Sequence, residues 1–153
     1  MAEDWGGDLF CAINLGWDYK QRTVDLIILG YVEKLIHKYQ HTTPRILEHH
    51  PHQHNPPKYG KKIQYVESAD DTPPFKKDEI KKLMEIIGSL LFLGRAINNA
   101  MLMALSDLVT SQAKCNKETQ EAENDILNYC ATHPNSTIIF QGRQMTLKVH
   151  SDA

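Results

Sequence analysis

Two apolar runs separated by a polar turn open the chain. The runs cover residues 9–15 and 23–29, and residues 18–22 between them are polar. β-Tolerant apolar residues on both sides of a short polar segment predict a β-hairpin. Apolar residues then recur at helical spacing and predict a short amphipathic helix that ends near position 41. These residues are Val32, Leu35, Ile36 and Tyr39.

Residues 42–76 have a different composition. Proline occurs here repeatedly, and four histidines lie close together. Proline removes a backbone donor and disfavours helix in the residue before it. We therefore expect a long Pro/His-rich connection that divides the chain in two. The histidines are His49, His50, His52 and His54.

The segment 77–134 predicts about three helices. Apolar residues at i, i+3 and i+4 spacing run through residues 77–95, and a second stripe covers residues 97–108. These two stripes fit either a helical hairpin or one bent helix. A third helix is expected over residues 117–132, closed by Pro134.

Residues 135–153 predict a second β-hairpin, with apolar strands at 137–140 and 145–149 around a polar turn. The expected fold class is therefore α+β. The expected organisation is a hairpin and short helix over 1–41, a connection over 42–76, a helical segment over 77–134 and this second hairpin. Because a two-stranded hairpin leaves strand edges unpaired, we also expect self-association through those edges.

The composition excludes some classes of protein but indicates no particular function. The 153 residues are 41% hydrophobic and carry 17 Lys and Arg against 19 Asp and Glu, a formal charge of −2, which excludes both general disorder and a strongly basic nucleic-acid-coating protein. No apolar run reaches the roughly 18–20 residues that cross a bilayer, and the acidic start does not fit a signal peptide. We expect an intracellular protein, cytoplasmic or nuclear, that is not secreted and has no membrane partner.

The cysteines and histidines form no pattern typical of a disulfide framework or a fixed metal site. Cys11, Cys115 and Cys130 show no CxxC spacing, so they are expected to be reduced thiols. The cluster His49–His54 contains the commonest transition-metal ligand. A fixed zinc site needs three or four ligands held by surrounding structure, which a proline-broken segment does not provide. A solvated loop is the favoured interpretation, and a metal-binding loop remains an alternative.

Lys34, Lys38 and His41 fall along one side of the helix expected before position 41. Cations arranged along a helix can contact the phosphates of a nucleic acid, which supply most non-specific affinity. From composition alone, an ordinary solvated helix face is the simpler explanation. The sequence contains no Gly-rich phosphate loop and no Gly-x-Ser-x-Gly nucleophile, and thus no complete active site.

Several blocks of sequence follow one another in a characteristic order. They occupy residues 9–15, 17–19, 22–24, 30–41, 57–60, 86–92, 127–134 and 150–153. Together these blocks resemble the reverse transcriptase region of the polyprotein of copia-type LTR retrotransposons. The resemblance covers nearly the whole chain, from the end of the palm through thumb and connection to the first strand of ribonuclease H. One departure is Ala12, where the family usually has glycine.

The resemblance assigns roles to residues. It implies that the first hairpin is a primer grip, whose tip holds the primer terminus, and that the helix after it is the first thumb helix, which follows the template-primer backbone. The segment Ile87–Leu90 would let two helices approach closely. Asp152 matches the first metal-binding carboxylate of ribonuclease H. The nucleic-acid-binding residues implied in this way are Phe10, Cys11, Ala12, Ile13, Lys34, Lys38 and His41.

The resemblance also implies an incomplete fragment of a larger fold. The intact family enzyme uses Mg²⁺, and Asp152 alone does not hold the two ions that such a site uses. We therefore expect weak binding of an RNA–DNA hybrid without catalysis, with the missing palm and ribonuclease H segments as partners. The alternative is a small helical protein-interaction module that does not bind nucleic acid.

Overall fold

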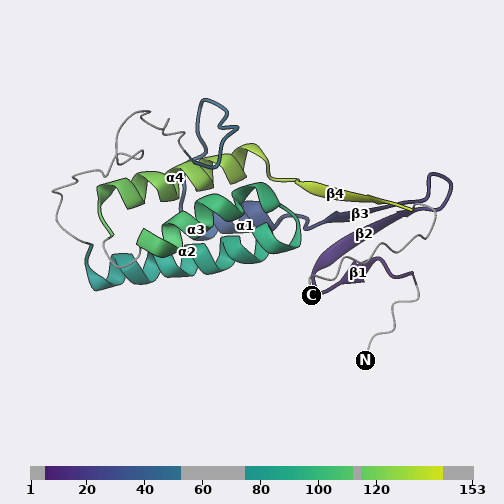
Figure 1. Cartoon of the computed structure of the whole chain (residues 1–153), viewed down its shortest axis with the longest axis horizontal. Helices are drawn as coiled ribbons and strands as arrows, with labels where there is room; N and C mark the ends of the chain where they lie inside the picture. Colours follow the sequence, from purple (N-terminus) through teal and green to yellow (C-terminus); the bar gives the residue numbers. More distant parts are fainter. Residues whose placement is uncertain (1–5, 53–74, 112–114, 143–153) are drawn as a thin grey trace, which may run out of the picture.

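The computed structural model describes residues 6–52, 75–111 and 115–142. These residues form a four-stranded antiparallel sheet and a bundle of helices, so the predicted α+β class is confirmed. Figure 1 shows the sheet extending from one end of the bundle. The elements in chain order are β1 (Leu9–Phe10), β2 (Ile13–Asp18), β3 (Thr23–Ile27), α1 (Tyr31–Lys38), α2 (Lys77–Ala96), η1 (Asn99–Met101), α3 (Leu102–Ser111), α4 (Lys117–Thr132) and β4 (Thr137–Gln141).

The first apolar run is not one strand, as the sequence predicted, but two. Cys11 and Ala12 form a tight turn between β1 and β2, which pair as Leu9 with Asn14 and Phe10 with Ile13. Both turn residues have positive φ, 50° for Cys11 and 66° for Ala12. Two-residue hairpin loops need this backbone, and they usually obtain it from glycine or asparagine. The turn was missed because neither residue is a typical turn former.

The strands β2 and β3 form the predicted hairpin. Its turn is closed by Asp18, whose Oδ1 accepts hydrogen bonds from the backbone N–H groups of Lys20 and Gln21, both at 2.9 Å. Aspartate commonly closes turns in this way because its short side chain reaches the backbone two residues on.

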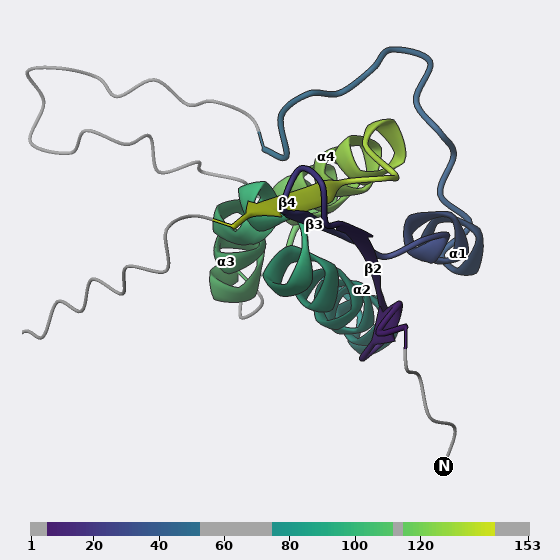
Figure 2. The ribbon, with the colours of Figure 1, turned by 90° about the vertical axis from the view of Figure 1, so that its right-hand side faces the viewer.

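The strand β4 completes the sheet by pairing with β3. The register runs from Thr23 opposite Gln141 to Ile27 opposite Thr137. The sequence predicted two separate hairpins, whereas the structure joins one strand of each and covers the edge of β3. Figure 2 shows β4, β3 and β2 side by side in front of the helices. The second strand expected in the C-terminal hairpin, residues 145–149, lies outside the described residues.

The helices α2 and α3 form a helical hairpin, which decides between the two arrangements left open by the sequence. Their close approach depends on Gly94, where an added Cβ would lie only 3.1 Å from Leu102 Cδ2 and 3.2 Å from Met101 Cγ. The resemblance assigned such an approach to residues 87–90. Gly88 is not the residue that permits it, because a Cβ added there would meet nothing within 4 Å.

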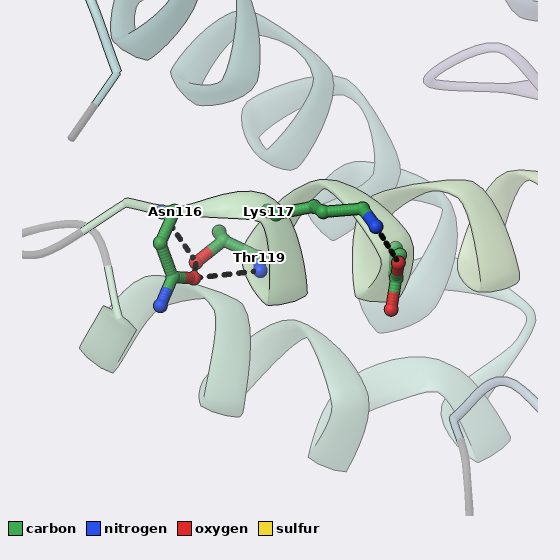
Figure 3. A network of polar contacts seen from close by, with 4 residues as sticks. Asn116, Lys117 and Thr119 are labelled. Atoms are coloured by element: carbon green, nitrogen blue, oxygen red, sulfur yellow. Dashed lines mark hydrogen bonds and ion pairs between the residues drawn. The ribbon is translucent and has the colours of Figure 1, made fainter. Parts of the chain in front are cut away.

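The helix α4 begins at a well-formed N-cap. Asn116 Oδ1 accepts hydrogen bonds from the backbone N–H of Thr119 at 3.1 Å and from its hydroxyl at 3.0 Å (Figure 3). An N-cap side chain of this kind satisfies one of the N–H groups that a helix start leaves without a partner. The surface pair of Lys117 and Glu121 follows, with Nζ 3.6 Å from Oε1. Thr132 ends the helix two residues before Pro134, as predicted.

The hydrophobic core lies among the helices. Its buried members come from the helices and the residues next to them, including Ile28 between β3 and α1. Ile13, Leu26 and Ile138 reach the core from the strands but are only partly buried. The sheet therefore rests against the bundle without entering it. The largest fully buried side chains are Leu83, Ile86, Leu90, Met101, Leu105, Leu108, Ile126 and Cys130.

Candidate nucleic-acid interface

Two tyrosines fix α1 against α2. Tyr31 donates a hydrogen bond from its hydroxyl to the backbone carbonyl of Ser89 at 2.9 Å, and the Tyr39 hydroxyl lies 3.2 Å from Ser89 Oγ. On the same side of α1, Val32 and Leu35 are buried in the core. The helix predicted to carry the nucleic-acid-binding cations is therefore a rigid part of the bundle.

Lys34 and Lys38 are both exposed on this anchored helix, one turn apart. Lys38 donates a hydrogen bond from Nζ to the Tyr39 hydroxyl at 3.0 Å, and its ammonium lies 4.7 Å from the centre of the Tyr39 ring. The hydrogen bond to Tyr39 is the main reason why the pKa of Lys38 is raised, so this group remains a cation at neutral pH. A charge held in one place can contact a phosphate with little further ordering.

His41 does not share the exposure of the two lysines. Its Nε2 lies 2.7 Å from Oδ1 of Asn128 in α4, and the side chain is half-buried. The amide oxygen is an acceptor, so this nitrogen carries the proton. His41 links α1 to α4, and the sequence could not have shown this, because Asn128 lies far along the chain.

The tight turn between β1 and β2 is mostly exposed. Phe10 keeps 67% of its surface accessible, and Cys11 and Ala12 are exposed beside it. Ile13 instead packs against the core and anchors the turn. Three of the four primer-grip residues implied by the resemblance are thus available to a ligand.

One aromatic pair next to the lysines was not predicted from the sequence. The rings of Tyr31 and Phe92 lie 5.5 Å apart, and Phe92 keeps 40% of its surface exposed. No local pattern reveals the pair, since it joins α1 to α2. Glu85 of α2 also acts on Lys38, so the surface is not uniformly positive.

The remaining candidates for chemistry contribute no active site in the described residues. Burial raises the pKa of Cys130 to about 12, which keeps it a neutral thiol, and it raises the pKa of Cys115 as well. Cys11 is exposed, and the three cysteines, all of them in the described ranges, form no disulfide. Asp152, assigned by resemblance to ribonuclease H, lies outside the described residues.

Comparisons with protein-family models, with curated proteins and with solved structures give no match for this chain. None of the helices in the described ranges has the length and apolar character needed to cross a membrane.

Proposed function

We propose that this chain grips a template-primer duplex as part of a retrotransposon reverse transcriptase, without catalytic activity of its own. The observation that carries the proposal is the anchored pair Lys34 and Lys38 on α1. Two lysines one turn apart can reach neighbouring phosphates of one strand, and Tyr39 holds one of them in position. The order of the sequence blocks supports the same role. We propose that the chain acts inside the cell.

The exposed turn between β1 and β2 fits the second half of this grip. Phe10 offers an aromatic ring that can pack against a base or sugar, and Ile13 anchors the turn to the bundle. Mg²⁺ belongs to the intact family enzyme, and the role proposed for this chain is binding alone.

The direct test measures binding of a labelled RNA–DNA hybrid to the full chain by fluorescence anisotropy over a series of salt concentrations. We expect log K to fall with log salt, and the double variant Lys34→Ala/Lys38→Ala to bind more weakly with a slope reduced by about 2, because each lysine releases about one counterion. The matched control is Lys20→Ala/Lys117→Ala, which removes the same charge elsewhere. Absence of binding at low salt, or equal losses in both variants, would refute the proposal.

A second candidate function is supported by one face of the sheet. The register places an entirely apolar set of residues on this face. Its inner members pack against the helical core, whereas Trp17 and Phe140 at its outer end keep 46% and 54% of their surfaces exposed. Exposed apolar patches mark interaction surfaces. The set is Phe10, Ile13, Leu15, Trp17, Val24, Leu26, Ile138 and Phe140.

This second candidate is a self-associating interaction module. Sedimentation velocity at rising protein concentration would then show dimers or larger species, and Trp17→Ser/Phe140→Ser would restore the monomer. A wild-type chain that stays monomeric at high concentration would exclude this candidate.

A further inference from the structure

Two histidines that are far apart in the sequence meet at the end of α4. His49 Nδ1 lies 3.3 Å from His133 Nε2, and the two ring centres are 5.3 Å apart. His49 comes from the segment after α1 and is exposed, while His133 follows α4 and is half-buried. His133 does not belong to the histidine cluster at 49–54, so no local pattern combines the two.

Both histidines are held at these positions. The backbone N–H of Glu48 donates to Thr132 Oγ1 at 3.0 Å, which ties the residue before His49 to the last residue of α4. The ring of His133 packs against that of Tyr129, with centres 4.9 Å apart. The backbone N–H of His133 also donates to the Tyr129 carbonyl at 3.0 Å. The pair is thus positioned by contacts that do not depend on the interaction between the two rings.

The spacing of the two nitrogens fits a metal ion. Two imidazole nitrogens bound to a tetrahedral zinc at about 2.0–2.1 Å lie about 3.3–3.4 Å from each other. The same arrangement separates the ring centres by about 5.2 Å, close to the distance found here. A hydrogen bond between neutral imidazoles explains the nitrogen distance too. On metal binding, the ring that donates this bond would carry its proton on its other nitrogen, so that both facing nitrogens could bind the ion.

We propose that His49 and His133 bind a divalent transition metal ion such as Zn²⁺. Neutral imidazole suits zinc, nickel and copper, whereas Mg²⁺ and Ca²⁺ prefer oxygen ligands. Among the residues that the structure describes, no group of three or more His, Cys, Asp or Glu residues is placed to hold a metal. With these two ligands alone, water would occupy the other coordination positions and the ion would exchange readily.

Such an ion would connect the segment after α1 to the end of α4. A metal ion that binds only the folded chain raises its free energy of unfolding. Above Kd, this gain grows with the logarithm of the ratio of metal concentration to Kd. This role is independent of nucleic-acid binding, since neither Lys34 nor Lys38 takes part.

The test is isothermal titration calorimetry of Zn²⁺ into the untagged, chelator-treated full chain, with Mg²⁺ titrated separately. We expect one zinc ion per chain and no Mg²⁺ binding. His49→Phe and His133→Phe should each weaken zinc binding by about tenfold or more, since even residues that only orient a ligand cost that much. Phenylalanine at position 133 keeps a ring against Tyr129. The matched control His50→Phe changes a neighbouring exposed histidine and should bind as the wild type does.

Far-ultraviolet circular dichroism of each variant checks that the fold is retained. Zinc binding that survives His133→Phe in a folded chain would overturn the proposal, because the ion would then belong to the cluster at 49–54 without α4. Absence of zinc binding to the wild-type chain would overturn it as well.

Discussion

The helical bundle and the sheet differ in how completely they bury their apolar side chains. In the bundle, side chains such as Ile86, Met101 and Leu105 have no accessible surface at all. In the four strands that the structure describes, no residue is fully buried. Hydrophobic stabilisation scales with the apolar area removed from water, so most of it resides in the helices. Backbone hydrogen bonds join the strands of the sheet, but the sheet depends on the bundle for its hydrophobic stabilisation.

The largest expected difference between the two regions is in hydrogen exchange. Amides in α2, α3 and α4 should exchange only through global unfolding, whose free energy in ordinary domains is about 5–15 kcal/mol. Amides of β1 and β2 should exchange through local opening at a much smaller cost, because few buried contacts hold these strands. Hydrogen–deuterium exchange with mass spectrometry checks this, and better protection of the first hairpin would reverse the comparison.

Truncating a buried side chain in the bundle should lower the free energy of unfolding more than truncating a larger side chain on the sheet. Leu105→Ala removes a fully buried side chain and should lower the free energy of unfolding by about 2–5 kcal/mol. Trp17→Ala removes more atoms, but Trp17 is 46% exposed and should cost less, even with loss of its 3.0 Å hydrogen bond to the Gly7 carbonyl. Urea unfolding followed by circular dichroism measures both values.

The contact between the helical bundle and the sheet depends on Asn98. This buried side chain donates to Ser136 Oγ at 3.0 Å and accepts from the Tyr129 hydroxyl at 3.3 Å, which connects the α2–η1 turn to α4 and to the approach to β4. Asn98→Ala should cost about 1–3 kcal/mol, because it leaves buried polar groups without this partner. The exposed neighbour Asn99 is the control, and Asn99→Ala should change stability by no more than about 0.5 kcal/mol.

The β1–β2 turn should gain stability from glycine. Ala12 sits at φ 66°, where an L-residue is strained by about 1–2 kcal/mol and glycine is not. Part of the gain is offset by the greater freedom of glycine in the unfolded chain. Ala12→Gly should therefore stabilise by up to about 1 kcal/mol. Ala122→Gly inside α4 should instead destabilise by a similar amount, and equal signs in thermal unfolding would contradict the assigned turn.

The smallest effect concerns a carboxyl group in the bundle. Burial raises the pKa of Glu123, and Lys82 opposes the shift in part. The folded chain therefore binds this proton more tightly than the unfolded chain, so stability falls as pH rises from the ordinary value of 4.5 through the raised pKa. Glu123→Gln should raise the melting temperature at neutral pH and lose that advantage at lower pH. Asp107→Asn, an exposed change on α3, is the control.

Helices were easier to predict from this sequence than their contacts were. The spacing of apolar residues located α2 and α4 to within one residue at each end, because helical periodicity is a local property. The helix before position 41 was predicted too long, since α1 ends at Lys38. The pairing of β3 with β4 and the contact of His41 with Asn128 join distant segments and leave no local trace. The candidate lysines were predicted by position, whereas the hydrogen bond of Lys38 to Tyr39 and the attachment of α1 to Ser89 needed the structure.

The pairing of β3 with β4 also bears on how the chain folds during synthesis. Ile27 and its partner Thr137 are separated by about 110 positions. On the ribosome, β3 emerges long before the strand that completes its edge, and closing so long a loop is slow. Until β4 emerges, the nascent chain presents the unpaired edge of β3, which makes it a candidate client for chaperones that shield extended segments.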